Sequence, residues 1–147
     1  MNCSTGSAPD EVLIDTGGLL SALFPDQHRH RECAEALEAA PSPLVLSPFV
    51  LAELDYLIGK LAGVDAQLAL LDEVSRGVYE LAAFSAYEVG LARRIADTYR
   101  DLRIGLADAS VVVLSNRLSD RDVLTVDERH FRVLAGDHPL RLLPADA

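Results

Sequence analysis

Short apolar runs alternate along this chain with longer segments in which apolar residues recur every three or four positions. The short runs, rich in Val, Leu and Ile, have the length and composition of buried strands, and the longer segments have the period of amphipathic helices. Strands are predicted at 12–14, 43–47, 78–84, 122–126 and 140–143. Helices are predicted at 15–24, 30–40, 48–62, 65–77, 85–101, 106–118 and 128–136.

Several helix boundaries carry specific sequence signals. Ser47 followed by Pro48 is typical of a helix start, because serine caps the first free N–H groups and proline suits the first helical position. Ser85 and Glu88 have the spacing of a capping box. Asp65 is predicted to open the fourth helix.

The alternation of strands with helices indicates the fold class. Strand–helix–strand units connect by right-handed crossovers, so their strands run parallel and helices cover both faces of the sheet. With 147 residues, half of them hydrophobic, the chain has the size of one domain with a substantial core. We therefore expect an α/β fold: a flexible tail over residues 1–10, then a single domain over 11–147 with a mainly parallel central sheet flanked by helices.

Two acidic residues stand where predicted buried strands end. Asp15 follows the run "VLI", and Asp127 follows the run "VLTV". Because parallel strands end at the same edge of a sheet, and ligands in such folds bind at that edge, the two carboxylates should lie on one side of the molecule. The carboxyl edge of the sheet is therefore the predicted position of a functional site.

Two further acids interrupt apolar helix patterns. Glu53 is flanked by apolar side chains at three and four positions in both directions, and Asp108 directly precedes the run "ASVVVLS". An unpaired buried carboxylate is costly, so such a residue is expected to pair, to take up a proton or to bind a metal. Asp55, on the same helix as Glu53, has smaller neighbours and is the weaker candidate.

Each acid also has a purely structural explanation. Asp15, Asp108 and Asp127 adjoin helix starts and could act as N-caps, and Glu53 could sit at a helix rim or pair with an arginine such as Arg93. Four acids gathered in one cleft would instead repel one another unless hard cations such as Mg²⁺ or Mn²⁺ lay between them. Such an ion can activate a water and stabilise a leaving oxygen, so the conjunction favours hydrolysis of a phosphodiester.

The charge balance limits how such a protein could bind nucleic acid. Against 13 Lys and Arg stand 23 Asp and Glu, and the formal net charge of −10 argues against a binder that relies on a general basic surface. Divalent ions can invert the charge locally where carboxylates cluster. No apolar run approaches the roughly 18 residues of a membrane span, and the start lacks a signal-peptide pattern, so a cytoplasmic protein is expected. Cys3 and Cys33 are expected to be incidental thiols.

The motifs around the four acids resemble those of PIN-domain ribonucleases, and within them the VapC-type toxins of bacterial toxin–antitoxin pairs. They are "IDTGGLL" with Asp15, "LAEL" with Glu53, "GLADASVVVLSNRL" with Asp108 and "VLTVDERHF" with Asp127, in the family's order over about 12–143. The resemblance implies an endoribonuclease dependent on Mg²⁺, or on Mn²⁺, in which Asp15 and Asp108 bind the metal and Glu53 and Asp127 complete the catalytic site. It also implies a VapB-like antitoxin partner and a homodimer.

Other polar residues near these motifs have ordinary explanations. Gly17 stands where many PIN relatives carry Ser, and no role is assigned to it. Thr16 and Thr125 adjoin the strand-end acids and could bind a carboxylate or phosphate, but Thr is common in strands and caps, so a structural role is favoured. The four histidines, His130 included, show no metal-ligand spacing combined with Cys, and a helix-surface or loop position is expected.

Other functions fit parts of the pattern. An aspartyl-phosphate enzyme of the haloacid dehalogenase type would need a second Asp where the chain has Gly17, and a receiver domain would need a late Lys after a strand, whereas Lys60 lies inside a helix. The main alternative is a PIN-like module that binds RNA or protein without cleaving. A free-standing RNA-processing nuclease is a further one.

Overall fold

The computed structural model describes residues 11–41, 43–119, 121–136 and 138–147, so the predicted tail at 1–10 lies outside the described residues. At its centre is a five-stranded sheet, parallel throughout, in the order β3-β2-β1-β4-β5. The strands are β1 Val12–Ile14, β2 Leu44–Leu46, β3 Glu80–Leu81, β4 Asp122–Leu124 and β5 Arg141–Leu143. The predicted α/β fold with a parallel central sheet is confirmed.

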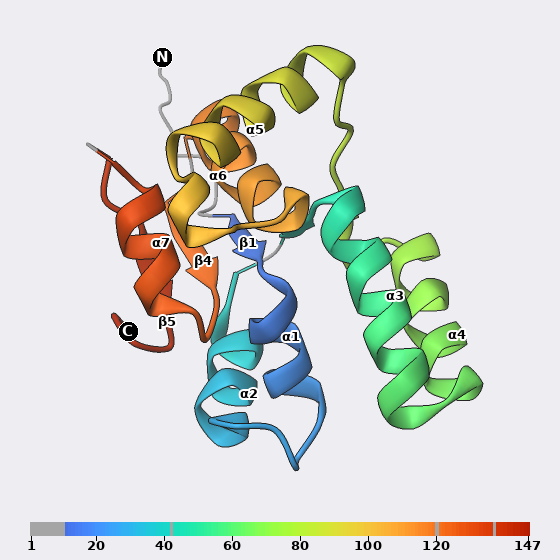
Figure 1. Ribbon diagram of the computed structural model, residues 1–147. Coiled ribbons are helices and arrows are strands. Elements are labelled where there is room, and N and C mark those ends of the chain that lie inside the picture. Colours follow the sequence, from blue (N-terminus) through green and yellow to red (C-terminus); the bar gives the residue numbers. More distant parts are fainter. Residues whose placement is uncertain (1–10, 42, 120, 137) are drawn as a thin grey trace, which may run out of the picture.

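Helices cover both faces of this sheet (Figure 1). They are α1 Thr16–Leu23, α2 His30–Ala39, α3 Pro48–Ala62, α4 Val64–Ser75, α5 Ala86–Thr98, the 3₁₀ turn η1 Arg100–Leu102, α6 Leu106–Leu118 and α7 Glu128–Leu134. On one face α1 packs against α2, which contacts β4; on the other, α6 contacts β1 and carries α5. Helices α3 and α4 form a hairpin beside the sheet. Among the described helices, none combines the length and apolarity needed to cross a membrane.

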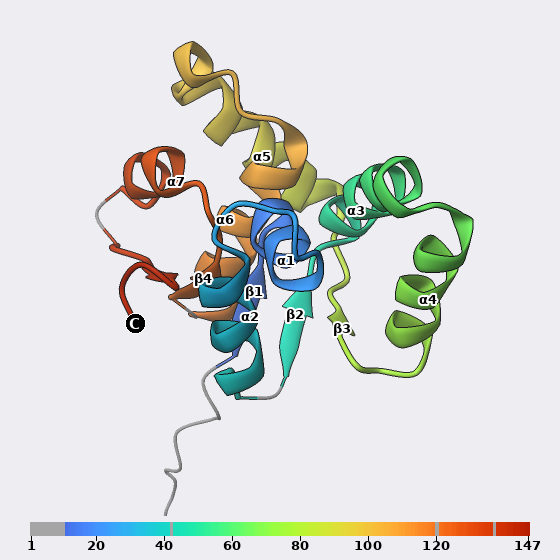
Figure 2. The same cartoon turned by 90° about the horizontal axis from the view of Figure 1, so that it is seen from below.

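The order of the strands creates a switch point between β1 and β4. From β1 the chain proceeds outward through β2 and β3 on one side, and it later returns to pair β4 with the other side of β1. Leu13, Ile14, Leu46 and Leu124 fill the core at this point, each at most 1% exposed. Figure 2 shows the carboxyl ends of these strands directed toward the region between α7 and α3, where α1 begins.

The predicted helix starts are confirmed at two places and wrong at a third. The Ser47 hydroxyl accepts hydrogen bonds from the N–H groups that follow it, and Ser85 and Glu88 form the capping box. Asp65 does not open α4: Gly63 occupies the N-cap, with φ at +89°, a conformation that glycine adopts without strain. The tight turn between α3 and α4 therefore uses a glycine in place of a side-chain cap.

The largest differences in length from the prediction are at two other elements. The strand expected at 78–84 is only Glu80–Leu81, an edge strand whose two residues are both exposed. The helix expected to reach Asp101 ends at Thr98, and the chain continues as the turn η1, which Arg103 closes with a left-handed φ of +53°. Cys33 is a buried free thiol, and Cys3 lies outside the described residues.

Candidate active site

Asp15 lies at the switch point, between the end of β1 and the start of α1. Its backbone N–H donates to the carbonyl oxygen of Leu124 at 3.0 Å. Gly18 brings α1 against the same carbonyl, since a Cβ there would lie 2.2 Å from that oxygen. The Asp15 side chain is 4% exposed and makes no capping hydrogen bond, so the capping explanation does not account for it.

Thr125 connects Asp15 to Asp127. Its hydroxyl donates to Asp15 Oδ2 at 2.7 Å and accepts the backbone N–H of Asp127 at 2.9 Å. The residue is fully buried, and its bond to Asp15 is shielded from water. Of the roles considered for Thr125, the hydrogen bond to a carboxylate is present: the residue orients the Asp15 side chain and holds the backbone of Asp127.

Asp108 joins the cluster from α6, on the face of the sheet opposite to α1 and α2. It lies in the first turn of α6, whose N-cap is Gly105, so Asp108 is not a cap. Its negative charge acts on Asp15, whose pKa it raises. Burial raises the pKa of Asp108, and the negative charges of Asp127 and Glu53 raise it further.

Asp127 serves both as a helix cap and as a site residue. Its Oδ1 accepts the backbone N–H of His130, which caps α7, and its Oδ2 lies 2.9 Å from His130 Nδ1. Ligand atoms of Asp108, Asp127 and His130 all lie within 4.8 Å of one another. Sequence reasoning missed His130, although its position three residues after Asp127 at the start of a helix places the two side chains together.

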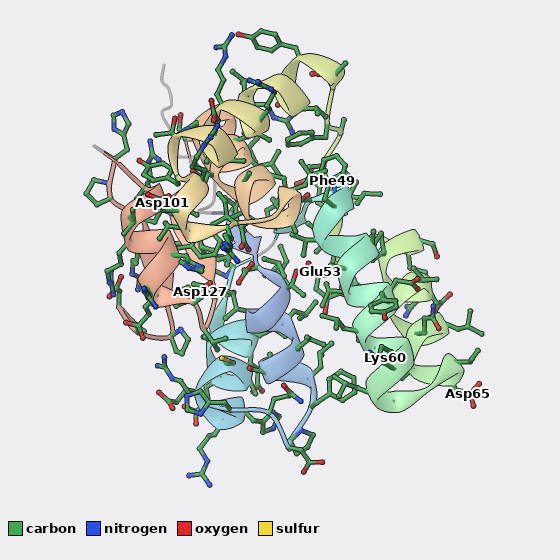
Figure 3. The ribbon with its side chains drawn as sticks, in the orientation of Figure 1. Phe49, Glu53, Lys60, Asp65, Asp101 and Asp127 are labelled. Carbon is green, nitrogen blue, oxygen red and sulfur yellow. The ribbon has the colours of Figure 1, made fainter. Side chains whose placement is uncertain are left out.

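Glu53 lies at the outer side of the site. The prediction that it interrupts a buried helix face is wrong, because Val50, Leu54 and Ile58 form the buried side of α3 and Glu53 is exposed. It is still close enough to raise the pKa of Asp108. In Figure 3, Glu53 extends from α3 and Asp127 lies on the α7 side, on opposite sides of the start of α1.

The structure also bears on the arginine pairing suggested for Glu53 and on Asp55, the weaker site candidate. Among the described residues, Glu53 forms no ion pair with Arg93 or Arg94. Asp55 accepts a hydrogen bond from the Gln67 side chain at 2.8 Å, which links α3 to α4. Asp55 is therefore a structural residue of the hairpin and stands outside the acidic cluster.

Asp15 is buried deeply enough to hold a proton near neutral pH. Burial, then the charge of Asp108, raises the pKa of Asp15 to about 7, although the Thr125 hydrogen bond opposes this shift. A divalent cation would relieve the repulsion between the negative charges of Asp15 and Asp108. Carboxylate oxygens are also the ligands that Mg²⁺ and Mn²⁺ prefer. The Thr16 hydroxyl, also buried, has no hydrogen-bond partner within the described part of the chain. The donor set thus fits a divalent cation.

Gly17 lies close to this cluster. A Cβ at this position would lie 3.0 Å from Val126 Cγ2 and 3.9 Å from Asp15 Oδ2. A side chain here would therefore stand beside the Asp15 carboxylate, with slight crowding of Val126.

Comparison with protein families identifies the class to which this arrangement belongs. The family model described as "PIN domain" matches residues 12–136. The chain is 45% identical over 123 residues to Ribonuclease VapC26 of Mycobacterium tuberculosis, an alignment covering 84% of this chain and 91% of that protein. The chain belongs to the PIN-domain family.

Solved structures of low sequence identity share the fold. The crystal structure of Mycobacterium tuberculosis VapC20, described as a Sarcin-Ricin loop cleaving toxin, matches with a TM-score of 0.76 at 17% identity, covering 85% of this chain and 95% of that one. FitAcB from Neisseria gonorrhoeae matches with a TM-score of 0.63 at 18% identity, covering 88% and 95%. A toxin–antitoxin complex from Klebsiella pneumoniae matches with a TM-score of 0.60 at 19% identity, covering 80% and 88%.

Proposed function

We propose that this protein is a metal-dependent endoribonuclease that hydrolyses phosphodiester bonds in RNA and acts as the toxin of a VapBC-type pair. Membership of the PIN-domain family and the 45% identity to a protein named Ribonuclease VapC26 support it. The observation that carries the proposal is the meeting of Asp15, Asp108 and Asp127 at the switch point of the sheet, with Asp15 buried and its pKa raised to about 7.

The acids have distinct proposed roles. Asp15 and Asp108 bind Mg²⁺ or Mn²⁺ directly, and Glu53 and Asp127 complete the catalytic site. A cation bound there supplies Lewis-acid stabilisation of phosphate charge and a more acidic water. Thr125 keeps Asp15 Oδ2 in place, which leaves the other carboxylate oxygen for the cation. A cation held by Asp15 would replace the proton that this side chain, with a pKa of about 7, can hold near neutral pH.

A cleavage assay tests the nuclease activity. Purified protein should cut RNA when Mg²⁺ or Mn²⁺ is added and should leave RNA intact in EDTA. RNA that is bound but never cut, with either ion and at high protein concentration, would favour the alternative of a catalytically silent PIN-like module.

An antitoxin is the proposed protein partner. Among the structural matches, one is described as a toxin–antitoxin complex, which supports such a partner. We expect a VapB-like tail to insert an Arg or Lys among the site acids, where it would pair with their charge and displace the cation. Its apolar side chains would lie along α1 and α3, where Leu23 is 37% exposed and Tyr56 is 64% exposed.

Co-expression tests the toxin role. Expression of this chain in the bacterial cytoplasm, where its RNA substrates would lie, should arrest growth, and Asp15→Asn should not. Co-expression with the adjacent short reading frame should relieve the arrest and yield a complex. RNA cleavage without growth arrest, or without a complex, would favour a free-standing RNA-processing nuclease. Light scattering of the purified chain tests the proposed homodimer.

A further inference from the structure

The proposed metal site contains a nitrogen donor in addition to its carboxylates. His130 Nδ1 lies 2.9 Å from Asp127 Oδ2, and both residues belong to the cluster that Asp108 completes within 4.8 Å. The imidazole is partly accessible, with 28% of its side chain exposed, so an ion can reach it from solvent.

The spacing of these two donors suits a shared cation. Ligands about 2.1 Å from a small octahedral ion lie about 3 Å apart when they occupy adjacent positions. The observed 2.9 Å between Nδ1 and Oδ2 has that length. When no cation is bound, a hydrogen bond joins the two atoms. When a cation is bound, both atoms can coordinate that cation.

Helix α7 fixes the imidazole in this position. Asp127 Oδ1 is occupied by the backbone N–H of His130, so Oδ2 is the oxygen left to face the ring. Phe131, the next residue, is fully buried and anchors the helix in the core. At the start of α7, Glu128 accepts a hydrogen bond from Arg29 at 3.1 Å, which ties the helix to the loop before α2. Asp127 thus orients the ring, and Phe131 and Glu128 hold the helix that carries it.

We propose that His130 is a direct metal ligand and that it shifts the preference of the site from Mg²⁺ toward first-row transition ions. Imidazole nitrogen contributes little to the binding of Mg²⁺, which prefers oxygen, whereas it strengthens binding of transition ions in the order Mn²⁺, Fe²⁺, Co²⁺. This inference rests on the proposed function, since it assumes that the acidic cluster binds a divalent cation.

Calorimetric titrations of metal-free protein with Mg²⁺, Mn²⁺ and Co²⁺, at one fixed pH, test the assignment. His130→Asn should weaken Co²⁺ binding at least tenfold and Mg²⁺ binding less than threefold. His130→Asp, which replaces the nitrogen with oxygen, should restore Mg²⁺ affinity and leave Co²⁺ binding weak. His28→Ala, at a loop position outside the cluster, is the matched control and should change neither.

A spectroscopic measurement separates ligation from a purely structural role. Pulsed electron paramagnetic resonance of the Mn²⁺ complex should detect coupling to one ¹⁴N nucleus in the wild type and none in His130→Asn. Equal losses for Mg²⁺ and Co²⁺ in His130→Asn, or no nitrogen coupling in the wild type, would overturn the inference while leaving the proposed nuclease intact. Failure of the wild type to bind any of the three ions would contradict the proposed function itself.

Discussion

The candidate site has a buried inner half and a partly exposed outer half, and the two halves differ in their effect on the free energy of folding. In the inner half, Asp15 and Thr125 are at most 4% exposed, and burial raises the pKa of Asp15 to about 7. In the outer half, Glu53 is exposed, and Asp127 and His130 are partly exposed. Ionising the inner carboxylates without a cation costs free energy of folding, whereas the outer groups remain solvated. Substitutions in the two halves should therefore separate effects on stability from effects on catalysis.

The largest effect is expected from Asp15 and Asp108, the two proposed metal ligands. Asp15→Asn or Asp108→Asn removes a charge partner of the cation and should lower the rate of RNA cleavage at least a thousandfold, about 4 kcal/mol of transition-state stabilisation. In Asp15→Asn, the oxygen of the new amide can still accept the Thr125 hydrogen bond, so the protein should stay folded. Single-turnover cleavage assays measure the loss, and Asp55→Asn, a change on the α3–α4 hairpin, is the control that should retain activity. Near wild-type cleavage by a folded Asp15→Asn protein would remove the basis for the site.

Thr125→Val should produce a smaller loss that combines both properties. It leaves the Asp127 N–H without its acceptor and Asp15 without its donor, so stability should fall by about 1–3 kcal/mol and cleavage by about 10- to 100-fold. Denaturant unfolding and cleavage rates check the two effects. Thr98→Val, at the exposed end of α5, is the control and should change neither. A Thr125→Val protein of unchanged stability would mean that the buried hydroxyl does not hold the inner half together.

Glu53→Gln tests the outer half. Because Glu53 is solvated and interacts with Asp108 only through its charge, cleavage should fall about tenfold while the unfolding free energy changes by less than about 0.5 kcal/mol. Cleavage rates and denaturant unfolding of this variant, compared with Glu38→Gln on the exposed side of α2, measure both. A loss of stability comparable to that of Thr125→Val would erase the distinction between the two halves.

The smallest effect is expected from Gly17→Ser. The added Cβ would lie 3.0 Å from Val126 Cγ2, so Val126 must move by a few tenths of an ångström, and the new side chain would stand beside Asp15. We expect cleavage within about threefold of the wild type and a small change in stability. Melting curves and metal titrations of the variant check this. A tenfold or greater change in metal affinity would place residue 17 among the determinants of the inner half.

The sequence predicts the acids at the strand ends better than it predicts their partners. Asp15 and Asp127 follow short apolar runs, and the parallel sheet required by the strand–helix alternation brings strand ends together. By contrast, the bond from Thr125 to Asp15 joins residues 110 positions apart, and no local pattern contains it. The exposure of Glu53 was also not predictable from periodicity, because it depends on how α3 is rotated against α1 and α6, which contact it. Gly63 replaced the predicted cap at Asp65 because the turn between α3 and α4 needs a positive φ.

Thermal unfolding of the wild type and of Asp15→Asn as a function of pH tests most directly whether the inner half exchanges a proton for a cation. The folded-state pKa of Asp15, about 7, lies above its ordinary value of 3.8. The stability that protonated Asp15 contributes to the wild type is therefore fully present below about pH 4 and is lost as the pH rises toward 7. In EDTA, the difference in melting temperature between the wild type and Asp15→Asn should therefore decrease as the pH is raised from about 4 to about 7. Above pH 7, saturating Mg²⁺ or Mn²⁺ should raise the melting temperature of the wild type more than that of the variant. A difference that is independent of pH in EDTA, with equal responses of the two proteins to the metal, would contradict the account.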